Sequence, residues 1–437
     1  MHQQAQSKGV TGSAGKAASV NDMEKMKGLL KMNINQEGGT EMTRKTKVMA
    51  IMLVLMMAAG LLAGCGQQAA PAPVPEGELS AAVMLMDYEA KWDLIVEQAK
   101  REGKVTFYSY SEEPFFKEMA DQFQAEYGIS VEVIMGDQNA IFDKVAAEGN
   151  RPQGTVDAIL MGGQNLGKMI DEGMFYGPFA EMVPNHKYLD TVAAYFTEGI
   201  AIRGMLVPFR RNQTGFVFNP EHVSNPPQTV AELESWIEAN PGRFGYAPPN
   251  SGGSGQAFVT ALIYELTGGA AQYSGDYDES KTAAWSDVWD WLNKIEPNIT
   301  YGNSNADILD KINQGEIWLA PNWEDMTFKY MEAGNLFQHA EIYIPEGIAM
   351  LGGSDDFAVI KNAPNKAAAL VWINYLISEG AQEQMNDMIG AKPARQNVVA
   401  EKNLISDAEI SAKGSTWFNG DYKTYMINTW IEEVGRQ

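Results

Sequence analysis

Strand and helix patterns alternate in a regular order in the stretch that follows residue 100. Segments rich in β-branched and aromatic residues, which favour strands, are separated by segments whose apolar residues recur at helical spacing. Strands are expected at Lys104–Tyr110, Ile129–Met135 and Val156–Met161, with helices around Phe116–Tyr127 and Ile141. Strands that alternate with helices predict an α/β fold with mixed, mostly parallel sheets flanked by helices.

The same alternation restarts later in the chain. Thr229 and Glu232 have the spacing of a capping box, which predicts the start of a helix. Further strands are expected at Gly215–Asn219, Phe244–Ala247, Ile317–Ala320 and Glu341–Ile344, and further helices at Ala257–Leu266, Trp285–Ile295, Ile308–Ile312, Ala367–Ile377 and Tyr422–Val434. A second block of this kind indicates a second α/β unit.

The only cysteine, Cys65, follows a short apolar segment. Arg44, Lys45 and Lys47 precede an uncharged run, Val48–Ala63, that ends in small residues. This order is typical of a signal peptide, and with the cysteine it resembles the lipobox of bacterial lipoproteins. The resemblance implies cleavage before Cys65 and acylation of that residue. A membrane-spanning anchor is the alternative, but the run is shorter than the roughly 20 residues that a spanning helix needs.

We therefore expect a chain that is lipid-anchored on the outer face of the cytoplasmic membrane. Residues 42–64 form the signal peptide, with Met42 as a credible start, and residues 1–41 are a leader of doubtful translation. Residues 65–78 are rich in proline and alanine, which predicts a tether rather than a packed core. The remaining chain from Leu79 is long enough for two domains.

Charge and composition exclude several classes of partner. Beyond Gly64 the chain holds 25 basic and 52 acidic residues, a formal net charge of −27. Nucleic acid is an unsuitable partner, because its binding requires neutralisation of phosphates. The acidity has two interpretations, colloidal solubility and an indication about the ligand, and solubility is favoured. With one cysteine, no disulfide forms within the chain.

Several segments, in this order, resemble one family: the extracellular solute-binding proteins of ABC importers, in the group of ferric-ion, thiamine, polyamine and phosphonate binders. The matching segments are Lys104–Tyr110, Val156–Gly163, Leu206–Asn219, Gly315–Trp323, Ile344–Gly347 and Ala358–Asn386. Gly162–Asn165, Gly173–Phe179 and Gly242–Pro249 are similar to the Ynj-type branch. Leu166 stands where that branch has an aromatic residue.

The resemblance implies a two-lobed periplasmic-binding-protein type II fold with a hinge between the lobes. Lobe one is expected at 79–213 and 346–385, and lobe two at 214–345 and 386–437. Ligand would bind in the cleft between the lobes, and closure would present it to an ABC permease and its ATPase. The family implies a monomer without a cofactor and without enzymatic activity.

One group of candidate ligand residues is aromatic and acidic. Tyr108, Ser109, Tyr110, Ser111 and Glu112 follow the first strand, and Trp323, Glu324 and Asp325 follow a later one. Loops at the carboxyl ends of parallel strands form the natural crevice of such folds. A tryptophan beside carboxylates suits an organic cation. The alternatives are a packed tyrosine in the first loop and a helix cap with a half-buried tryptophan in the second.

The other group suits an anion. Gly163, Gln164 and Asn165 open one helix, and Ser251, Gly252, Gly253 and Ser254 open another. Helix starts with exposed backbone N–H groups attract negative charge. Arg210, beside Arg211, could clamp an anion or pair with nearby acids, and the second interpretation is slightly favoured.

Together these patterns favour binding of a thiamine-like or polyamine-like cation, with a phosphonate or phosphorylated metabolite as the alternative. The iron-binding members of the family use an adjacent tyrosine pair, and because no Tyr-Tyr pair occurs here the resemblance argues against iron. No metal site is expected because the four histidines are widely separated. A surface hydrolase that uses Glu324 and Asp325 is a remote alternative, since neighbouring residues at a helix start point apart. A sensory lipoprotein is equally remote.

Overall fold

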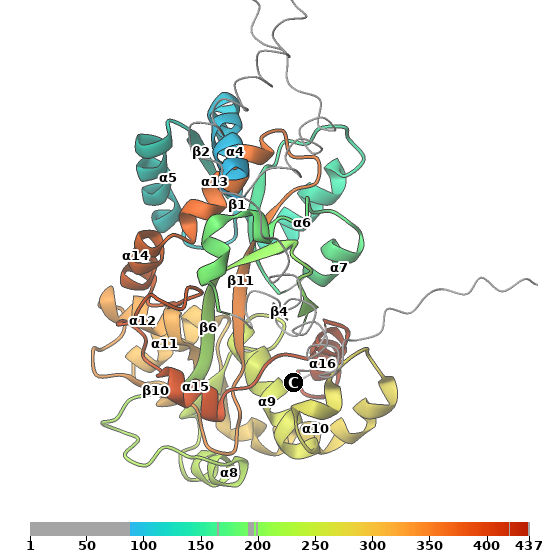
Figure 1. Cartoon of the computed structure of the whole chain (residues 1–437). Helices are drawn as coiled ribbons and strands as arrows, with labels where there is room; N and C mark the ends of the chain where they lie inside the picture. The colour runs from blue at the N-terminus through green and yellow to red at the C-terminus, as the bar shows by residue number, and fades with distance from the viewer. Residues whose placement is uncertain (1–87, 164–165, 191–195, 198–199, 419, 436–437) are drawn as a thin grey trace, which may run out of the picture. The chain divides into compact units, whose positions relative to one another are not determined.

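The computed structural model describes residues 88–163, 166–190, 196–197, 200–418 and 420–435 (Figure 1). The signal peptide, Cys65, the tether, Gln164 and Asn165 lie outside the described residues. Every described residue belongs to one compact unit, Leu85–Gln437.

The first parallel group of strands has β1 at its centre. β1 (Lys104–Ser109) pairs in parallel with β2 (Ser130–Met135) and β3 (Ala158–Gly162). The helices of this region are α4 (Tyr88–Glu102), α5 (Glu113–Tyr127), α6 (Gln138–Glu148) and α7 (Leu166–Asp171). The predicted strand–helix alternation is confirmed here, although the sequence analysis did not anticipate α4.

The second parallel group has β7 at its centre. β7 (Phe244–Tyr246) pairs in parallel with β8 (Ile299–Tyr301) and β9 (Leu319–Trp323). The helices here are α8 (Val230–Ala239), α9 (Gly253–Thr267), α10 (Ser286–Ile295), α11 (Asn305–Asn313), α12 (Glu324–Glu332) and α16 (Gly420–Glu433). Thr229 accepts a hydrogen bond from the Glu232 N–H, so the predicted helix start is confirmed.

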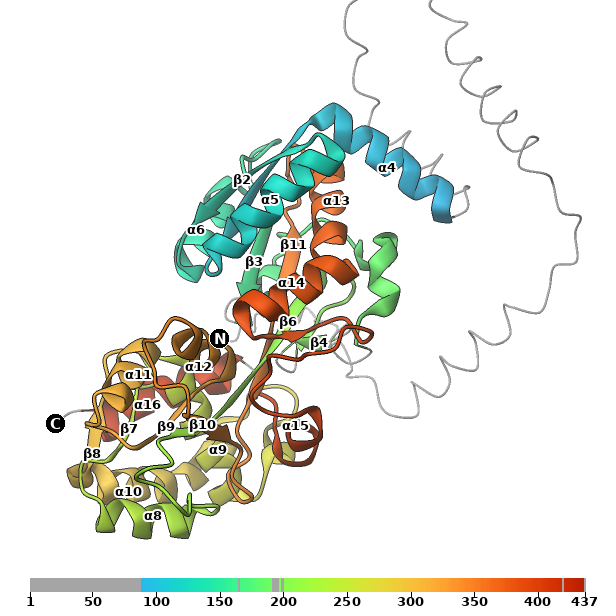
Figure 2. The same cartoon turned by 90° about the vertical axis from the view of Figure 1, so that its left-hand side faces the viewer.

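Two antiparallel strands join these groups into one sheet. β6 (Leu206–Phe218) is 13 residues long and pairs first with β11 (Gly352–Val359) and then with β9. β11 pairs on its other side with β3. Figures 1 and 2 show β6 and β11 running side by side between the two groups of helices. The sheet is therefore mixed, with the strand order β2-β1-β3-β11-β6-β9-β7-β8.

The remaining elements complete the junction and its flanks. Short strands β10 (Glu341–Tyr343) and β12 (Lys392–Pro393) also pair with β6. β4 (Phe196–Thr197) and β5 (Ile200–Ala201) form a separate hairpin. Three further helices are α13 (Lys366–Leu376), α14 (Glu379–Ile389) and α15 (Asp407–Lys413).

Two separate hydrophobic cores lie on either side of the junction. The first core draws its buried residues from Ile95 to Phe209 and from Phe357 to Ala394. The second core draws them from Phe216 to Leu351 and from Ile405 to Val434. Each core thus combines two distant stretches of chain, which the crossing strands β6 and β11 connect.

The chain passes from one core to the other at slightly different residues from the predicted lobe boundaries. Ile348, Met350 and Leu351 pack in the second core, and Ile389 and Ala391 pack in the first. The lobe boundaries themselves stay a prediction. A strand was also expected to end at Ala320, but β9 continues through Trp323, so that this tryptophan lies on the sheet and not after it.

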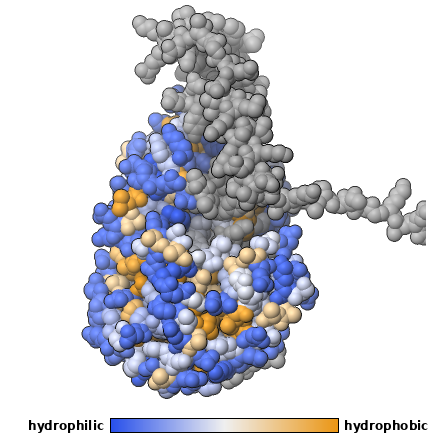
Figure 3. Space-filling model, turned by 60° about the horizontal axis from the view of Figure 1, so that its bottom comes forward, coloured by the Kyte–Doolittle hydropathy of each residue, from blue (hydrophilic) through white to orange (hydrophobic). Residues whose placement is uncertain are grey.

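The surface that the structure describes is mainly polar. Figure 3 shows a face that is largely hydrophilic, with small apolar patches between hydrophilic areas. Among the described residues, few large hydrophobic side chains are exposed, and the most exposed is Val399 at 77%. No helix in the described part of the chain combines the length and apolar character needed to cross a bilayer.

Candidate functional site

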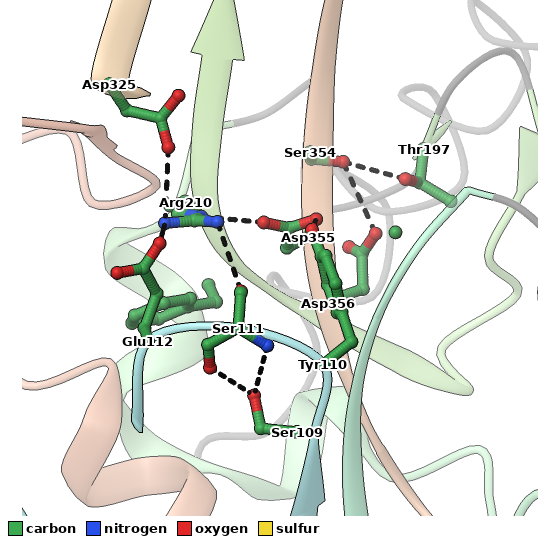
Figure 4. Close-up of polar contacts among 12 residues, drawn as sticks. Ser109, Tyr110, Ser111, Glu112, Thr197, Arg210, Asp325, Ser354, Asp355 and Asp356 are labelled. Carbon is green, nitrogen blue, oxygen red and sulfur yellow. Dashed lines mark hydrogen bonds and ion pairs between the residues drawn. The ribbon is translucent and has the colours of Figure 1, made fainter. Parts of the chain in front are cut away.

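Four segments meet where the two parallel groups of strands join. The loop after β1 and the middle of β11 come from the side of the first core, and the start of α12 comes from the side of the second. β6 passes between them and contributes Arg210. Figure 4 shows Glu112, Asp325 and Asp355 directed at the guanidinium of Arg210 from three sides.

The Arg210 side chain is 3% exposed and its donors are occupied by carboxylates. Arg210 Nε donates to Asp355 Oδ2 at 2.6 Å, and Nη1 donates to Glu112 Oε1 at 2.8 Å. Asp325 Oδ2 lies farther away, 3.5 Å from Nη1. We call Arg210, Glu112, Asp325, Asp355 and Lys329 the junction cluster. Lys329 on α12 completes it by donating to Glu112 Oε1 at 2.7 Å.

Burial and charge set the protonation of the cluster. Burial disfavours the charged form of Arg210, but Asp355, Glu112 and Asp325 outweigh it and hold the pKa of Arg210 well above its ordinary value. Burial would raise the pKa of Glu112, but Arg210 and Lys329 lower it to about 2. The cluster therefore holds three carboxylates against two cations, an excess of one negative charge.

Tyr110 extends the cluster toward the first core. Its hydroxyl donates to Asp355 Oδ1 at 2.5 Å. Burial, together with the negative charge of Asp355, raises the pKa of Tyr110 well above its ordinary value. The tyrosine is therefore a neutral hydrogen-bond donor at physiological pH, and it fixes one oxygen of Asp355 while Arg210 fixes the other.

Glu112 adopts a backbone conformation that is costly for a glutamate. It precedes α5 with φ of 63° and ψ of 37°, in the left-handed region. Such a conformation costs on the order of 1–3 kcal/mol and persists only where surrounding contacts enforce it. Here the enforcing contacts are the ion pairs from Arg210 and Lys329. Strain of this kind occurs preferentially at functional positions.

Trp323 lies on the same face of the sheet, against the start of α9. A Cβ atom on Gly253 would lie only 3.2 Å from Cζ2 and Nε1 of the Trp323 ring, so the ring packs on the glycine backbone. Thr214 pairs with Trp323 and lies four residues beyond Arg210 in β6, about 13 Å along the strand. Trp323 is half-buried.

The structure brings several of the predicted residues together and separates others. Ser111 Oγ accepts a weak hydrogen bond from Arg210 Nη2 at 3.4 Å, and Ser109 Oγ donates to the Ser111 carbonyl oxygen. Tyr108 packs against the first core. Gly163 follows directly after β3. A Cβ atom on its neighbour Gly162, the last residue of β3, would lie 3.2 Å from Asp355 Oδ1. Gln164 and Asn165 lie outside the described residues.

The start of α9 is less open to an anion than expected. Ser254 is fully buried, and both its N–H and its hydroxyl donate to Asn305 Oδ1. The N–H groups of Ser251 and Gly252 donate to the Pro248 carbonyl oxygen. Gly253 is covered by the Trp323 ring. The side chain of Asn305 therefore takes the place that an anion was expected to occupy.

Glu324 and Asp325 point in different directions, as expected for neighbours at a helix start. Glu324 Oε1 accepts a hydrogen bond from the Ile405 N–H at 2.7 Å, away from the junction cluster. Arg210 and Lys329 lie 3.5 and 3.9 Å from Asp325, the longest ion-pair distances in the cluster. Asp325 is thus the carboxylate of the cluster that is least committed to a partner.

Sequence analysis missed two members of the cluster. Asp355 lies in β11, between the matching segments Ile344–Gly347 and Ala358–Asn386, and was not singled out, yet Asp355 and Asp356 are consecutive buried acids in a mostly buried strand. Lys329 lies four residues after Asp325 on α12. A pair of acids in a buried strand is a usable signal, because carboxylates are almost never buried without partners.

The described residues hold no group of three or more His, Cys, Asp and Glu side chains placed to bind a metal ion. The three carboxylates of the junction cluster instead surround a guanidinium. The arrangement offers hydrogen bonding, charge and an aromatic surface, which suit recognition of a small molecule.

Comparison with known proteins gives the family. The model of the bacterial extracellular solute-binding protein family matches residues 118–412. Protein YnjB of Escherichia coli is 23% identical over 319 residues, which cover 69% of this chain and 81% of YnjB. The spermidine/putrescine-binding periplasmic protein of Salmonella typhimurium is 28% identical over 157 residues, 34% of this chain and 42% of that protein.

The fold has solved counterparts. The spermidine/putrescine ABC transporter substrate-binding protein PotD of Streptococcus pneumoniae superimposes with a TM-score of 0.60 at 15% identity, over 75% of this chain and 98% of PotD. The predicted periplasmic-binding-protein type II fold is thereby confirmed. Members of this family bind small solutes for ABC importers and deliver them to a permease, and they are not enzymes. The chain belongs to the bacterial extracellular solute-binding protein family, as the substrate-binding protein of an ABC importer.

Proposed function

We propose that the solute is a small organic cation, thiamine-like or polyamine-like, held between Trp323 and Asp325 on the Arg210 face of β6. The observation that carries this proposal is the position of Asp325. It lies two residues beyond the half-buried Trp323 and makes only long ion pairs, in a cluster with one excess negative charge. A cation over a tryptophan ring gains about 0.5–2 kcal/mol, and a carboxylate adds the counter-charge.

The length of the site supports an extended ligand. About 13 Å of strand separates Arg210 from the position that pairs with Trp323. A linear amine, or a cation joined to an aromatic ring, could contact both ends. The resemblance to spermidine/putrescine-binding proteins is consistent with this class, although the Salmonella protein aligns over only 42% of its own length.

An anionic solute has less support at this site. Its expected contacts were Arg210, the start of α9 and the Gly163–Asn165 segment, of which Gln164 and Asn165 lie outside the described residues. The donors of Arg210 are occupied by carboxylates, and Ser254 donates to Asn305. A phosphonate or phosphorylated metabolite would have to displace these contacts.

Titration calorimetry with the purified chain tests the proposal. Putrescine, spermidine and thiamine are compared with phosphonates and sugar phosphates. We expect saturable binding of a cation, and Trp323→Ala should weaken it about tenfold or more. Trp318→Ala is the matched control, because Trp318 stacks on His222 elsewhere in the second core region. Binding of phosphorylated compounds alone, or equal losses in both variants, would refute the cation assignment.

We also propose that the chain is held at the membrane by lipid on Cys65 and works there as a monomer. The support is the lipobox-like segment that ends in Leu62–Cys65 and the proline-rich stretch after it. In cells fed radiolabelled palmitate, label should enter the chain and be lost in Cys65→Ser. Labelled Cys65→Ser protein would contradict the anchor. Sedimentation should give the mass of a single chain, and a stable dimer would contradict the monomer.

A further inference from the structure

A cavity of about 540 Å³ lies beside the junction, with walls from β6, β11, β12, the start of α12 and the segment after α15. Its volume falls in the range of small-molecule sites, about 300–1,000 Å³. The charged lining residues are Asp190, Arg211, Glu324 and Lys392, and Ser354 and Thr416 contribute hydroxyl groups. Two basic and two acidic side chains thus line one partly open pocket.

Strand geometry separates this cavity from the proposed solute site. Successive side chains of a strand point to opposite faces, so Arg211 faces away from the junction cluster that surrounds Arg210. Ser354 and Lys392 pair with Arg211 in the sheet and share its face. Figure 4 shows Asp355 turned to Arg210 while the neighbouring Ser354 turns to Thr197, on the other side of β11.

Arg211 has hydrogen-bonding capacity that its neighbours do not use. Its Nη1 lies 3.5 Å from Asp190 Oδ2. Its Nε is buried, and among the described residues it has no hydrogen-bond partner. A buried donor without a partner is costly. The Nε edge of a guanidinium is suited to bind a carboxylate through two parallel hydrogen bonds.

Lys392 and Glu324 are buried side chains in the wall of the cavity, and burial disfavours the charged form of each. They are 7% and 2% exposed. Burial, followed by the charge of Arg211, lowers the pKa of Lys392 to about 8, and burial raises the pKa of Glu324 to about 7. Lys392 pairs with Asp407, which is 74% exposed, and Glu324 accepts backbone hydrogen bonds from Ile405 and Leu404. A bound molecule carrying both signs of charge would compensate both side chains.

We propose that this cavity is a second binding site, which takes a small zwitterion with a carboxylate and an ammonium group, such as a free amino acid. The carboxylate binds on the side of Arg211 and Lys392, and the ammonium group binds on the side of Glu324 and Asp190. An inorganic anion would meet the two acids, and a polyamine would meet the two cations. The balanced lining therefore selects a ligand that carries one charge of each sign.

Titration calorimetry on the full chain tests this site, with pools of the common amino acids as the probe and inorganic phosphate and putrescine as the comparison. At least one amino acid should bind saturably at millimolar concentration. Arg211→Gln should weaken that binding about thirtyfold or more, because it removes the charged partner of the carboxylate. Thr416→Trp, at an exposed position in the wall, should fill the cavity and abolish binding.

Two controls separate this site from the solute site. Val399→Trp introduces the same bulk at an exposed position that does not line the cavity, and it should leave amino-acid binding unchanged. Trp323→Ala, which tests the solute site, should do the same. The proposal is overturned if no amino acid binds, if phosphate or putrescine alone shows the Arg211 dependence, or if Trp323→Ala removes amino-acid binding while Arg211→Gln spares it.

Discussion

Arg210 and Arg211 are adjacent in the sequence and in the same strand, yet their surroundings are opposite. The Arg210 side chain is 3% exposed and lies among three carboxylates. The Arg211 side chain is 32% exposed, with one long contact to Asp190 and a buried Nε that has no partner in the described part of the chain. Strand alternation alone places the first toward the junction cluster and the second toward the cavity.

The difference separates two roles for one residue type. Arg210 receives contacts from β1, β11 and α12, so it links segments that belong to both cores. Its donors are committed to the protein itself. Arg211 keeps donor capacity for another molecule. A buried cation whose partners are complete stabilises an arrangement of the chain, and a cation whose partners are incomplete is available for recognition.

The largest expected effect comes from removing the charge at each position. Arg210→Met leaves Glu112, Asp325 and Asp355 buried without their shared cation, and should cost about 3–5 kcal/mol of unfolding free energy. Arg211→Met is the matched control and should cost about 0–1 kcal/mol, because its ion pair with Asp190 is partly exposed. Urea denaturation measures both. Losses of similar size would show that the two faces do not differ in the way described.

Acid should reveal the contribution of Glu112. The pKa of Glu112 in the folded chain is about 2, below its ordinary value of 4.5. Its stabilising contribution is therefore present above pH 4.5 and is lost as the pH falls toward 2. Glu112→Gln should cost on the order of 2 kcal/mol at pH 7 and flatten the acid limb of the stability curve. Glu113→Gln, at the exposed neighbouring position, should leave that limb unchanged; a flattened curve there would argue against the assignment.

Glu324 should change the free energy of unfolding with pH in the opposite direction to Glu112. Its pKa in the folded chain is raised to about 7, so its contribution is fully present below pH 4.5 and is lost as the pH rises through 7. Glu324→Gln should remove this loss, on the order of 2 kcal/mol between pH 5 and 8. Thermal unfolding across that range measures the slope. Glu332→Gln, at the exposed end of the same helix, should keep the wild-type slope, and an unchanged slope in Glu324→Gln would contradict the buried carboxyl.

Most helices and strands could be predicted from the sequence, because they depend on the local spacing of apolar residues. The apolar face of Phe116–Tyr127 predicted α5 to within a few residues, and Thr229 predicted the start of α8. The limits of β9 were missed because its residues Pro321 and Asn322 are poor strand formers by propensity. Pairing with β6 overrides that propensity and carries the strand to Trp323.

The site was only partly predictable, because its members meet through long-range pairing. Tyr110, Glu112, Arg210 and Asp325 were identified individually, since each lies at the end of a strand or in a crossing segment. Asp355 lies 145 residues from Arg210 in the chain, and only the register of β6 against β11 brings the two together. Sequence alone could not say that Arg210 faces the carboxylates and Arg211 faces the cavity, because one residue of register exchanges the two faces.

The smallest effects on unfolding free energy should come from the neutral partners of the cluster. They test whether a directed hydrogen bond stabilises the chain more than a polar side chain that is merely nearby. Tyr110 donates to Asp355 at 2.5 Å, so Tyr110→Phe leaves a buried carboxylate oxygen without its donor and should cost about 1–2 kcal/mol. The Ser111 hydroxyl accepts a long hydrogen bond of 3.4 Å from Arg210, and Ser111→Ala should cost a few tenths of a kcal/mol. Urea denaturation of both variants decides the point. If Ser111→Ala cost as much as Tyr110→Phe, the cluster would be a diffuse polar contact and not a set of directed hydrogen bonds around Arg210.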